Sequence, residues 1–297
     1  LFPNPPASHN TAVGYQAGYS NTTGQLNTIV GRQAAYNMTT GTDNSALGAN
    51  ALNANTTGSY NTALGREAFH SNTTASNNTA VGYQAGESIP TGIRNTLIGS
   101  TAGALLTSGN YNTALGYIAL DADTLGQSSV AIGYGSLGSQ NFTTATDTYN
   151  VAVGLNAGNQ ITTGIQNTLL GSLAGDALTD ADDNVAIGKQ ALTADTLGSR
   201  SVAIGFNTLA DQNFTTATSA YNVAMGYNAG GGVTTGIQNT LIGGLAGDAL
   251  TTGKENVALG YAALSNDDVG NHSTAIGWNA LISQNFSTST DSNNTAV

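Results

Sequence analysis

The sequence predicts an all-β fold, a parallel β-roll or β-solenoid, and three observations support this prediction. A motif of the form Asn-Thr/Val-Ala-aliphatic-Gly recurs along the whole chain of 297 residues. Thirteen of its sixteen spacings are 17 and the other three are 21. No segment shows a sustained helical period, so we expect essentially no helix. A unit repeated this regularly stacks on its neighbours, and we expect about 16 coils, each coil being one turn of the solenoid.

Each copy of the motif has the pattern of a short strand. Counting the motif Asn as position 0, position +1 is Thr or Val, with one Ser at Ser45, position +2 is usually Ala and position +3 is always aliphatic. This alternation predicts a strand of about five residues, ended by the Gly at +4, which tolerates a positive φ. A Thr-Thr-Gly segment then predicts a second turn, which leaves room for two short strands per coil. The motif begins at Asn10, Asn27, Asn44, Asn61, Asn78, Asn95, Asn112, Ser129, Asn150, Asn167, Asn184, Ser201, Asn222, Asn239, Asn256, Ser273 and Asn294.

The repeated Asn predicts a side-chain ladder that satisfies backbone groups and binds no ligand. The two faces of the strand differ in size. Positions +1 and +3 carry Thr, Val, Ile or Leu, whereas +2 and +4 carry Ala and Gly. We expect the small residues inside and the larger ones in an outward stripe, which copies of the chain would bury about a shared axis. The prediction is a homo-oligomer, most simply a trimer; the alternative places the aliphatic stripe inside a monomeric roll.

The spacing divides the chain into three parts. Residues 1–9 form a lead-in or linker, and residues 10–77 keep strictly to the spacing of 17. Residues 78–297 follow a longer repeat, in which three spacings of 17 are followed by one of 21, and we expect this pattern to continue beyond the fragment. The additional residues of the long spacings fall in similar segments that contain Phe142, Phe214 and Phe286. Inserts in solenoids cluster on one face, so each Phe either covers the roll or contacts a ligand.

Position +5 carries many aromatic residues, among them Tyr134, Phe206 and Trp278. These rings follow the turn Gly, and we expect them near the surface. They could stack on sugar rings or brace neighbouring chains of an oligomer. With the three insert Phe residues they are the candidate surface contacts.

The composition excludes several classes of function. The net charge is −11 with only six Lys and Arg, so nucleic acid and acidic membranes are not expected partners. There is no Cys and no apolar run long enough to insert into a membrane. The acidic residues lie in turns without a calcium-binding pattern, and the three His residues fall at unrelated phases of the repeat. We therefore expect no metal, no cofactor and no catalytic residues, and classify the chain as a non-enzyme.

Residues 10–18 and 78–86, both NTAVGYQAG, resemble two related groups of proteins. One is the head repeat of trimeric autotransporter adhesins, whose Ser-Val-Ala-Ile-Gly core is matched at residues 129–133 and 201–205. The other is the shaft repeat of phage tail-fibre-like proteins. The first resemblance implies a left-handed, trimeric, parallel β-roll outside the cell. The length of the coil favours the fibre group.

The function expected from this resemblance is a non-enzymatic extracellular structural fibre, the shaft of a phage tail fibre or a microbial surface filament. The alternative is an adhesin head that binds a surface polysaccharide or a host receptor through insert loops and aromatics. Ten Asn-x-Ser/Thr sequons also occur, a number close to chance for this composition, and they are weak evidence for glycosylation.

Overall fold

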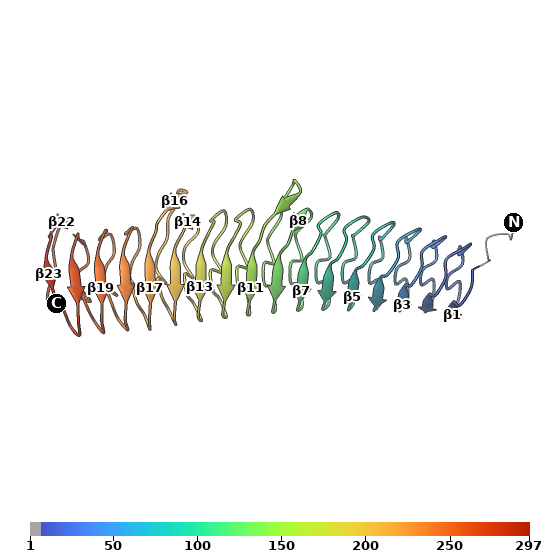
Figure 1. Ribbon diagram of the computed structural model, residues 1–297, viewed down its shortest axis with the longest axis horizontal. Helices are drawn as coiled ribbons and strands as arrows, with labels where there is room; N and C mark the ends of the chain where they lie inside the picture. The colour runs from blue at the N-terminus through green and yellow to red at the C-terminus, as the bar shows by residue number, and fades with distance from the viewer. Residues whose placement is uncertain (1–6) are drawn as a thin grey trace. The chain divides into compact units, whose positions relative to one another are not determined.

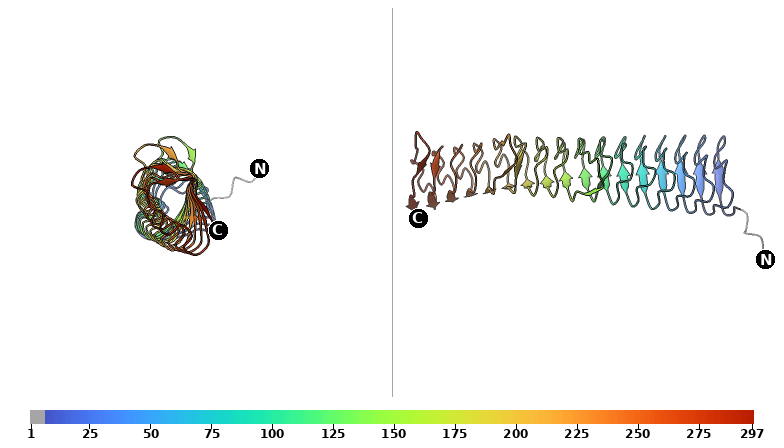
Figure 2. Two further views of the ribbon diagram at one scale, coloured as in Figure 1. Left: turned by 90° about the vertical axis from the view of Figure 1, so that its left-hand side faces the viewer. Right: turned by 90° about the horizontal axis from the view of Figure 1, so that it is seen from above.

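The computed structural model describes residues 7–297, and these residues form a parallel β-solenoid of about 17 turns without a helix. The predicted all-β fold class is therefore confirmed. The chain divides into two compact units, Leu1–Tyr149 and Asn150–Val297. Within each unit, every coil contributes one short strand from its motif, and these motif strands lie side by side (Figures 1 and 2).

The first unit stacks eight motif strands in parallel. Each residue pairs with the residue at the same motif position in the next coil, as in Thr11 with Thr28 and Thr28 with Ser45. The same register continues to the end of the unit. The strands are β1 (Thr11–Val13), β2 (Thr28–Val30), β3 (Ser45–Leu47), β4 (Thr62–Leu64), β5 (Thr79–Val81), β6 (Thr96–Ile98), β7 (Thr113–Leu115) and β9 (Val130–Ile132).

The second unit stacks nine motif strands in the same way, and the longer coil between β15 and β17 does not disturb the register. The extra residues of that coil are accommodated outside the strand column. The strands are β11 (Val151–Val153), β12 (Thr168–Leu170), β13 (Val185–Ile187), β15 (Val202–Ile204), β17 (Val223–Met225), β18 (Thr240–Ile242), β19 (Val257–Leu259), β21 (Thr274–Ile276) and β23 (Thr295–Ala296).

Two details of the predicted coil were wrong. The motif strand has three residues rather than about five, and within the described chain a second strand occurs only in the coils that carry an insert or directly precede one. The backbone explains both differences, because positions +6, +8 and −1 have positive φ, for example 54° at Gln33 and 46° at Ala35. A residue with positive φ leaves the extended region and interrupts the alternation of a strand. Second strands occur at the inserts, where β8 (Gly126–Gln127) pairs with β10 (Thr146–Asp147), β14 (Gly198–Ser199) with β16 (Thr218–Ser219), and β20 (Gly270–Asn271) with β22 (Thr290–Asp291).

The turn Gly at +4 is required by geometry, as predicted. Gly82 has a φ of 138°, and a Cβ added there would lie 2.4 Å from the carbonyl oxygen of Gly99 in the next coil. The same contact recurs along each unit, because +4 Gly residues approach the +4 Gly of the coil that follows. A larger residue would force the coils apart.

Three columns that compensate for one another fill the core of each coil. Where position +8 is Gly103, position +2 is the bulky Leu97 and position +11 is Leu106. A Cβ on Gly103 would lie 2.9 Å and 3.0 Å from those two leucines. In the next coil position +8 is Leu120, position +2 shrinks to Ala114 and position +11 becomes polar. In these two coils the side chain missing at +8 is thus offset by larger side chains at +2 and +11, which keeps their filled volumes similar.

The predicted Asn ladder is confirmed inside the solenoid. Asn61, which is buried, donates from Nδ2 to the carbonyl oxygen of Ala75 at 2.8 Å and to Oδ1 of Asn44 at 3.2 Å. Its own Oδ1 accepts from the backbone N–H of Asn78 at 3.1 Å. Each ladder Asn therefore satisfies backbone groups of its own coil and of the next coil, and this explains its recurrence without any ligand.

Candidate functional site

The outward face of the motif strands is the most extensive feature with functional potential. In β3, Ala46 is 1% exposed while Leu47 is 49% exposed. In β4, Ala63 is buried and Leu64 is exposed. The expected orientation, with small residues inside and aliphatic residues outside, is thus correct, and the alternative with the aliphatic stripe inside is wrong. We call positions +1 and +3 of the motif strands the strand face of each unit.

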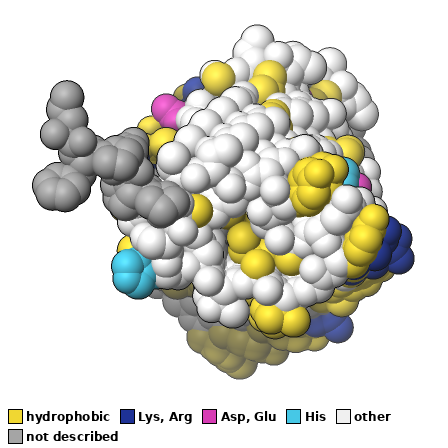
Figure 3. All heavy atoms as spheres, turned by 90° about the vertical axis from the view of Figure 1, so that its right-hand side faces the viewer, with side chains coloured by type: hydrophobic (Ala, Val, Ile, Leu, Met, Phe, Trp, Pro, Cys, Tyr) yellow, Lys and Arg dark blue, Asp and Glu magenta, His cyan; other side chains and the backbone are white. Residues whose placement is uncertain are grey.

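The strand face carries no charged residue in any described motif strand. A groove of about 240 Å³ lies on it across β2, β3 and β4, lined by Val30, Leu47, Leu64 and their neighbours. The 17 acidic and six Lys and Arg residues of the chain all lie elsewhere on the coils. Seen from the side of β1, the surface is mainly uncharged, with hydrophobic groups and few cations (Figure 3). The strand face is therefore suited to an uncharged, apolar partner surface.

Exposed aromatic residues lie just beyond the strand face, at position +5. The predicted contacts Tyr134, Phe206 and Trp278 are 49%, 42% and 76% exposed. Tyr134 lies 5.6 Å from Tyr117 of the preceding coil, and Phe206 stacks on Tyr227 of the following coil at 5.6 Å between ring centroids. These contacts brace adjacent coils of one chain.

Cations cover further ring faces. In four cases a Lys or Arg lies over an aromatic ring at the same motif position of the following coil: Arg66 over Tyr83, Arg94 over Tyr111, Lys189 over Phe206 and Arg200 over Tyr221. The distances to the ring centroids are between 5.4 Å and 5.9 Å. Such contacts contribute about 0.5–1 kcal/mol at exposed positions. Four of the six Lys and Arg residues thus act within the chain and cover ring faces on which a sugar would stack.

The insert turns place their Phe residues inward. Phe142 is 5% exposed and Phe214 is 6% exposed, so each ring covers the core beneath its insert. Their candidate role as surface contacts therefore needs correction, because a buried ring offers no surface to a ligand. Phe286 is partly exposed in the last insert. The residues around these rings, such as Thr143 and Thr215, are the exposed part of the inserts.

A buried carboxylate holds each of the first two insert turns in place. Asp195 accepts from the backbone N–H of Gly198 at 3.0 Å, from that of Phe214 at 3.2 Å and from Nε2 of Gln212 at 2.5 Å. The same three types of contact surround Asp123, its equivalent in the preceding long repeat. Burial raises the pKa of Asp123 and Asp195, although the hydrogen bonds to Gln and to backbone N–H groups oppose this shift. Each carboxylate is a structural brace rather than an accessible acid.

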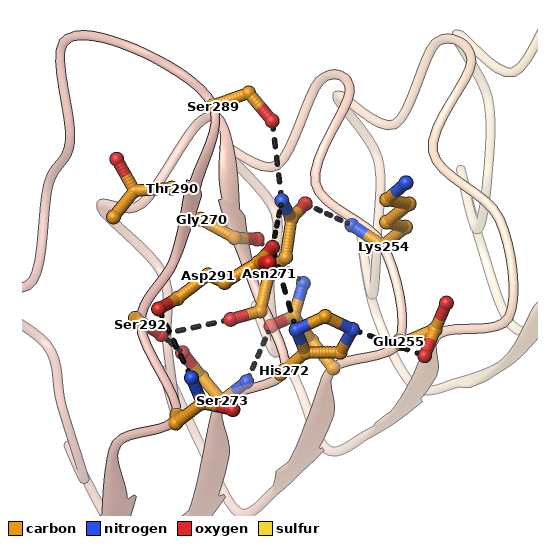
Figure 4. A network of polar contacts seen from close by, with 12 residues as sticks. Lys254, Glu255, Gly270, Asn271, His272, Ser273, Ser289, Thr290, Asp291 and Ser292 are labelled. Atoms are coloured by element: carbon orange, nitrogen blue, oxygen red, sulfur yellow. Dashed lines mark hydrogen bonds and ion pairs between the residues drawn. The ribbon is translucent and has the colours of Figure 1, made fainter.

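The third insert carries an additional polar cluster at the surface (Figure 4). Nε2 of His272 lies 3.1 Å from Oε2 of Glu255, and its Nδ1 lies 3.4 Å from Oδ1 of Asp291. Within the described chain no serine hydroxyl of this cluster bonds to the imidazole; Ser273 instead contacts Ser292 at 2.5 Å between Oγ atoms. Among these residues the imidazole therefore pairs with carboxylates rather than with a hydroxyl that it could activate as a nucleophile. It ties the insert strand β22 to two neighbouring coils.

Arg200 occupies at the second insert the position that His272 occupies at the third, directly before the motif. It bonds to Ser219 of β16 and lies 3.4 Å from Asp183. The sequence pattern did not single out position −1, where Arg200 and His272 lie, or the buried Asp and Gln residues at the inserts. The signal for the latter was available, because the pair Asp123 and Gln140 recurs as Asp195 and Gln212 in the core column at +11.

Residues 7–297 contain no group of three His, Asp or Glu side chains that could hold a metal ion. Over the same residues, no helix is long and apolar enough to cross a membrane. Comparisons with models of protein families, with curated proteins and with solved structures each gave no match to this chain.

Proposed function

We propose that the chain is a non-enzymatic structural element of an extracellular fibre, such as the shaft of a phage tail fibre or a microbial surface filament. The single observation that supports this proposal is the strand face. It is uncharged and repeated in every coil, with a hydrophobic residue at +3 and Thr, Ser or Val at +1, whereas the charged residues lie elsewhere. A surface of this kind is what a self-assembling structural protein needs, because soluble monomers rarely expose a large continuous apolar patch.

The energetic argument starts from single residues. Val13, Leu47, Leu64 and Leu115 are between 41% and 57% exposed in the first unit. Covering the remaining half of one such side chain contributes about 1 kcal/mol, which is half of the value for complete burial. In the second unit Leu170, Met225 and Leu259 have similar exposure. The gain adds up along the strand face, while no charge on this face opposes the approach of a second molecule.

The partner in this proposal is the chain itself. We take the assembly to be a homotrimer about a shared axis, which is the arrangement implied by the resemblance to adhesin heads. The mechanism is mechanical: the Asn ladders and parallel strands stiffen each chain, and association of the strand faces joins the chains. The inserts and turns then form the outer polar surface.

The mass of the protein in solution tests this proposal. Sedimentation or light scattering should give a multiple of the 29.7 kDa chain mass, with three chains expected. Leu47→Lys together with Leu64→Lys should release monomers, because two charges would be buried in the interface. Leu105→Lys is the matched control, since Leu105 is 50% exposed but lies outside the strand face. A wild-type chain that remains monomeric at high concentration contradicts the proposal.

A second candidate function is an adhesin head that binds surface polysaccharide or a host receptor. Trp278 favours it, because this ring is 76% exposed and is the most exposed aromatic side chain in the described chain. Exposed Trp rings stack well on sugar rings. Binding on a glycan array that is lost in Trp278→Ala, but kept in Phe214→Leu, would favour this candidate over the purely structural one.

A further inference from the structure

The ten sequons of the chain fall into distinct groups once their surroundings are known. The Asn side chains of three sequons are buried: Asn55 and Asn72 are 0% exposed and Asn271 is 3% exposed. Three others lie at equivalent places in the inserts and are exposed: Asn141, Asn213 and Asn285. N-linked glycosylation needs an accessible Asn amide, so the folded chain offers this chemistry at the inserts and withholds it at the buried sites.

The insert turn presents the two functional groups of the sequon together. Asn141 is exposed, Phe142 is buried and Thr143 is exposed, and the same order recurs at residues 213–215. Because the central Phe is anchored in the core, the Asn and the Thr are both left at the surface. The first two insert turns also project beyond the outline of the ordinary coils (Figure 1). A transferase could therefore reach amide and hydroxyl from one side.

The amide of the insert Asn is oriented by a contact within the chain. Oδ1 of Asn141 accepts a hydrogen bond from Oγ1 of Thr124 at 3.0 Å. Asn213 makes the same contact with Thr196 at 3.1 Å. The carbonyl side of each amide is thus turned toward the preceding coil, and the Nδ2 that becomes glycosylated lies on the other side of the amide group.

The remaining sequons lack this arrangement. Asn21 uses its amide in a turn with Gly24, at 2.9 Å and 3.2 Å. The sequon of Asn37 ends at Thr39, whose hydroxyl donates to the carbonyl oxygen of Thr56 at 3.0 Å. In the sequons of Asn77 and Asn293 the third residue belongs to a motif strand, β5 or β23, so its backbone is fixed in the ladder.

Among the sequons of the described chain, the first two inserts therefore stand apart. They combine an exposed Asn, a buried central residue and an exposed hydroxyl residue outside a motif strand. The third insert repeats the pattern, except that its central residue, Phe286, is only partly buried.

We propose that Asn141, Asn213 and Asn285 are acceptor sites for N-linked glycosylation. In this reaction Nδ2 forms a bond to C1 of an activated sugar, the bond from C1 to the diphosphate of a nucleotide or lipid donor breaks, and Nδ2 loses a proton. The sugar donor and the transferase come from outside the chain. The proposal does not rest on the proposed fibre function, because it needs only the exposure of the inserts.

The test uses the purified, folded chain with a soluble N-glycosyltransferase and a nucleoside diphosphate hexose. Peptide mass mapping then measures the hexose on each sequon in two samples, one glycosylated as the folded chain and one glycosylated after the chain is unfolded in urea. In the folded chain, occupancy of Asn141 and Asn213 should exceed that of Asn55 and Asn72 by at least about tenfold, since a buried Asn reacts only through opened molecules. After unfolding, this difference should disappear.

Two variants show that the sequon itself is recognised. Thr143→Ala should abolish hexose at Asn141 and leave Asn213 occupied, while Thr143→Ser should restore it. Thr143 is exposed, so neither change should disturb folding. If Asn141 and Asn213 react only after unfolding, or if hexose appears on the insert hydroxyls instead of the amides, the proposal is overturned.

Discussion

Removing one member of the Asn ladder should weaken the solenoid far more than its small side chain suggests. In Asn61→Ala, the carbonyl oxygen of Ala75 loses its donor at 2.8 Å. The backbone N–H of Asn78 loses its acceptor at 3.1 Å, and the bond to Asn44 is lost as well. These groups are inside the coil, where Asn61 and Asn78 are each 1% exposed.

The magnitude follows from the two backbone groups that remain without a partner. A buried donor or acceptor left unsatisfied costs about 1–3 kcal/mol. Two such groups give about 2–6 kcal/mol, and we expect about 3 kcal/mol because water can partly enter the space vacated by the amide. This is a large fraction of the roughly 5–15 kcal/mol that stabilises a typical domain.

Native-state hydrogen exchange measures this loss locally, and urea unfolding measures it globally. Repeat arrays lose stability near the altered repeat first, so the amides around Asn78 should exchange much faster in Asn61→Ala than in the wild type, while those of distant coils change little. Asn37→Ala is the control, because Asn37 is exposed and its replacement should change the unfolding free energy by at most about 0.5 kcal/mol. If Asn61→Ala and Asn37→Ala have the same small effect, the ladder does not stabilise the solenoid as argued.

Three further results are expected. Gly82→Ala should lower the free energy of unfolding by several kcal/mol, because the new Cβ would lie 2.4 Å from the carbonyl oxygen of Gly99. The control Gly244→Ala should be tolerated, since its Cβ would have its nearest contact at 3.4 Å. Equal thermal midpoints of the two variants would contradict this prediction. Burial raises the pKa of Asp123 and Asp195, so the folded chain binds protons at these carboxyl groups more tightly than the unfolded chain does. The stability gained from this protonation is complete below the pKa of an unfolded Asp, and it is lost as the pH rises through the pKa of the folded chain. The urea midpoint should therefore be higher near pH 4 than at about pH 7, and less so in the variant Asp123→Asn with Asp195→Asn; a midpoint that falls on acidification excludes this reasoning. Gln212→Ala should loosen the second insert by removing a donor to Asp195, seen as faster exchange of the Phe214 amide, which the distant Gln25→Ala should leave unchanged.

The periodicity of the sequence was sufficient to predict much of the fold. A strict spacing places Asn61 above Asn44 and Thr28 beside Ser45, because parallel stacking of equal coils leaves few other registers. The outward stripe was predicted from residue size alone, since the inside of a narrow coil favours Ala over Leu. The alternation of residue types gave the wrong strand length, because positive φ values at Gln33 and Ala35 depend on how the turn closes and leave little trace in composition.

The inserts show the limit of reading residue types in isolation. For Phe142 and Phe214 the sequence left two interpretations open, cover of the roll and contact with a ligand, and their burial confirms the first. Their burial depends on Asp123 and Asp195, which bond to the backbone N–H groups of these Phe residues from 19 positions earlier in the chain. A contact of that kind is set by the packing of one coil on the next.

By itself the sequence determined the coil, its period, its ladders and the face that would carry the aliphatic stripe. The physical reason is that each repeat meets only its neighbours, so a local pattern repeated at a fixed interval becomes a three-dimensional column. Only the tertiary structure decided which sequon Asn residues are exposed, which aromatic ring faces are covered and which way the insert Phe residues point. These properties depend on adjacent coils in contact, such as Arg66 over Tyr83, and no single repeat contains them.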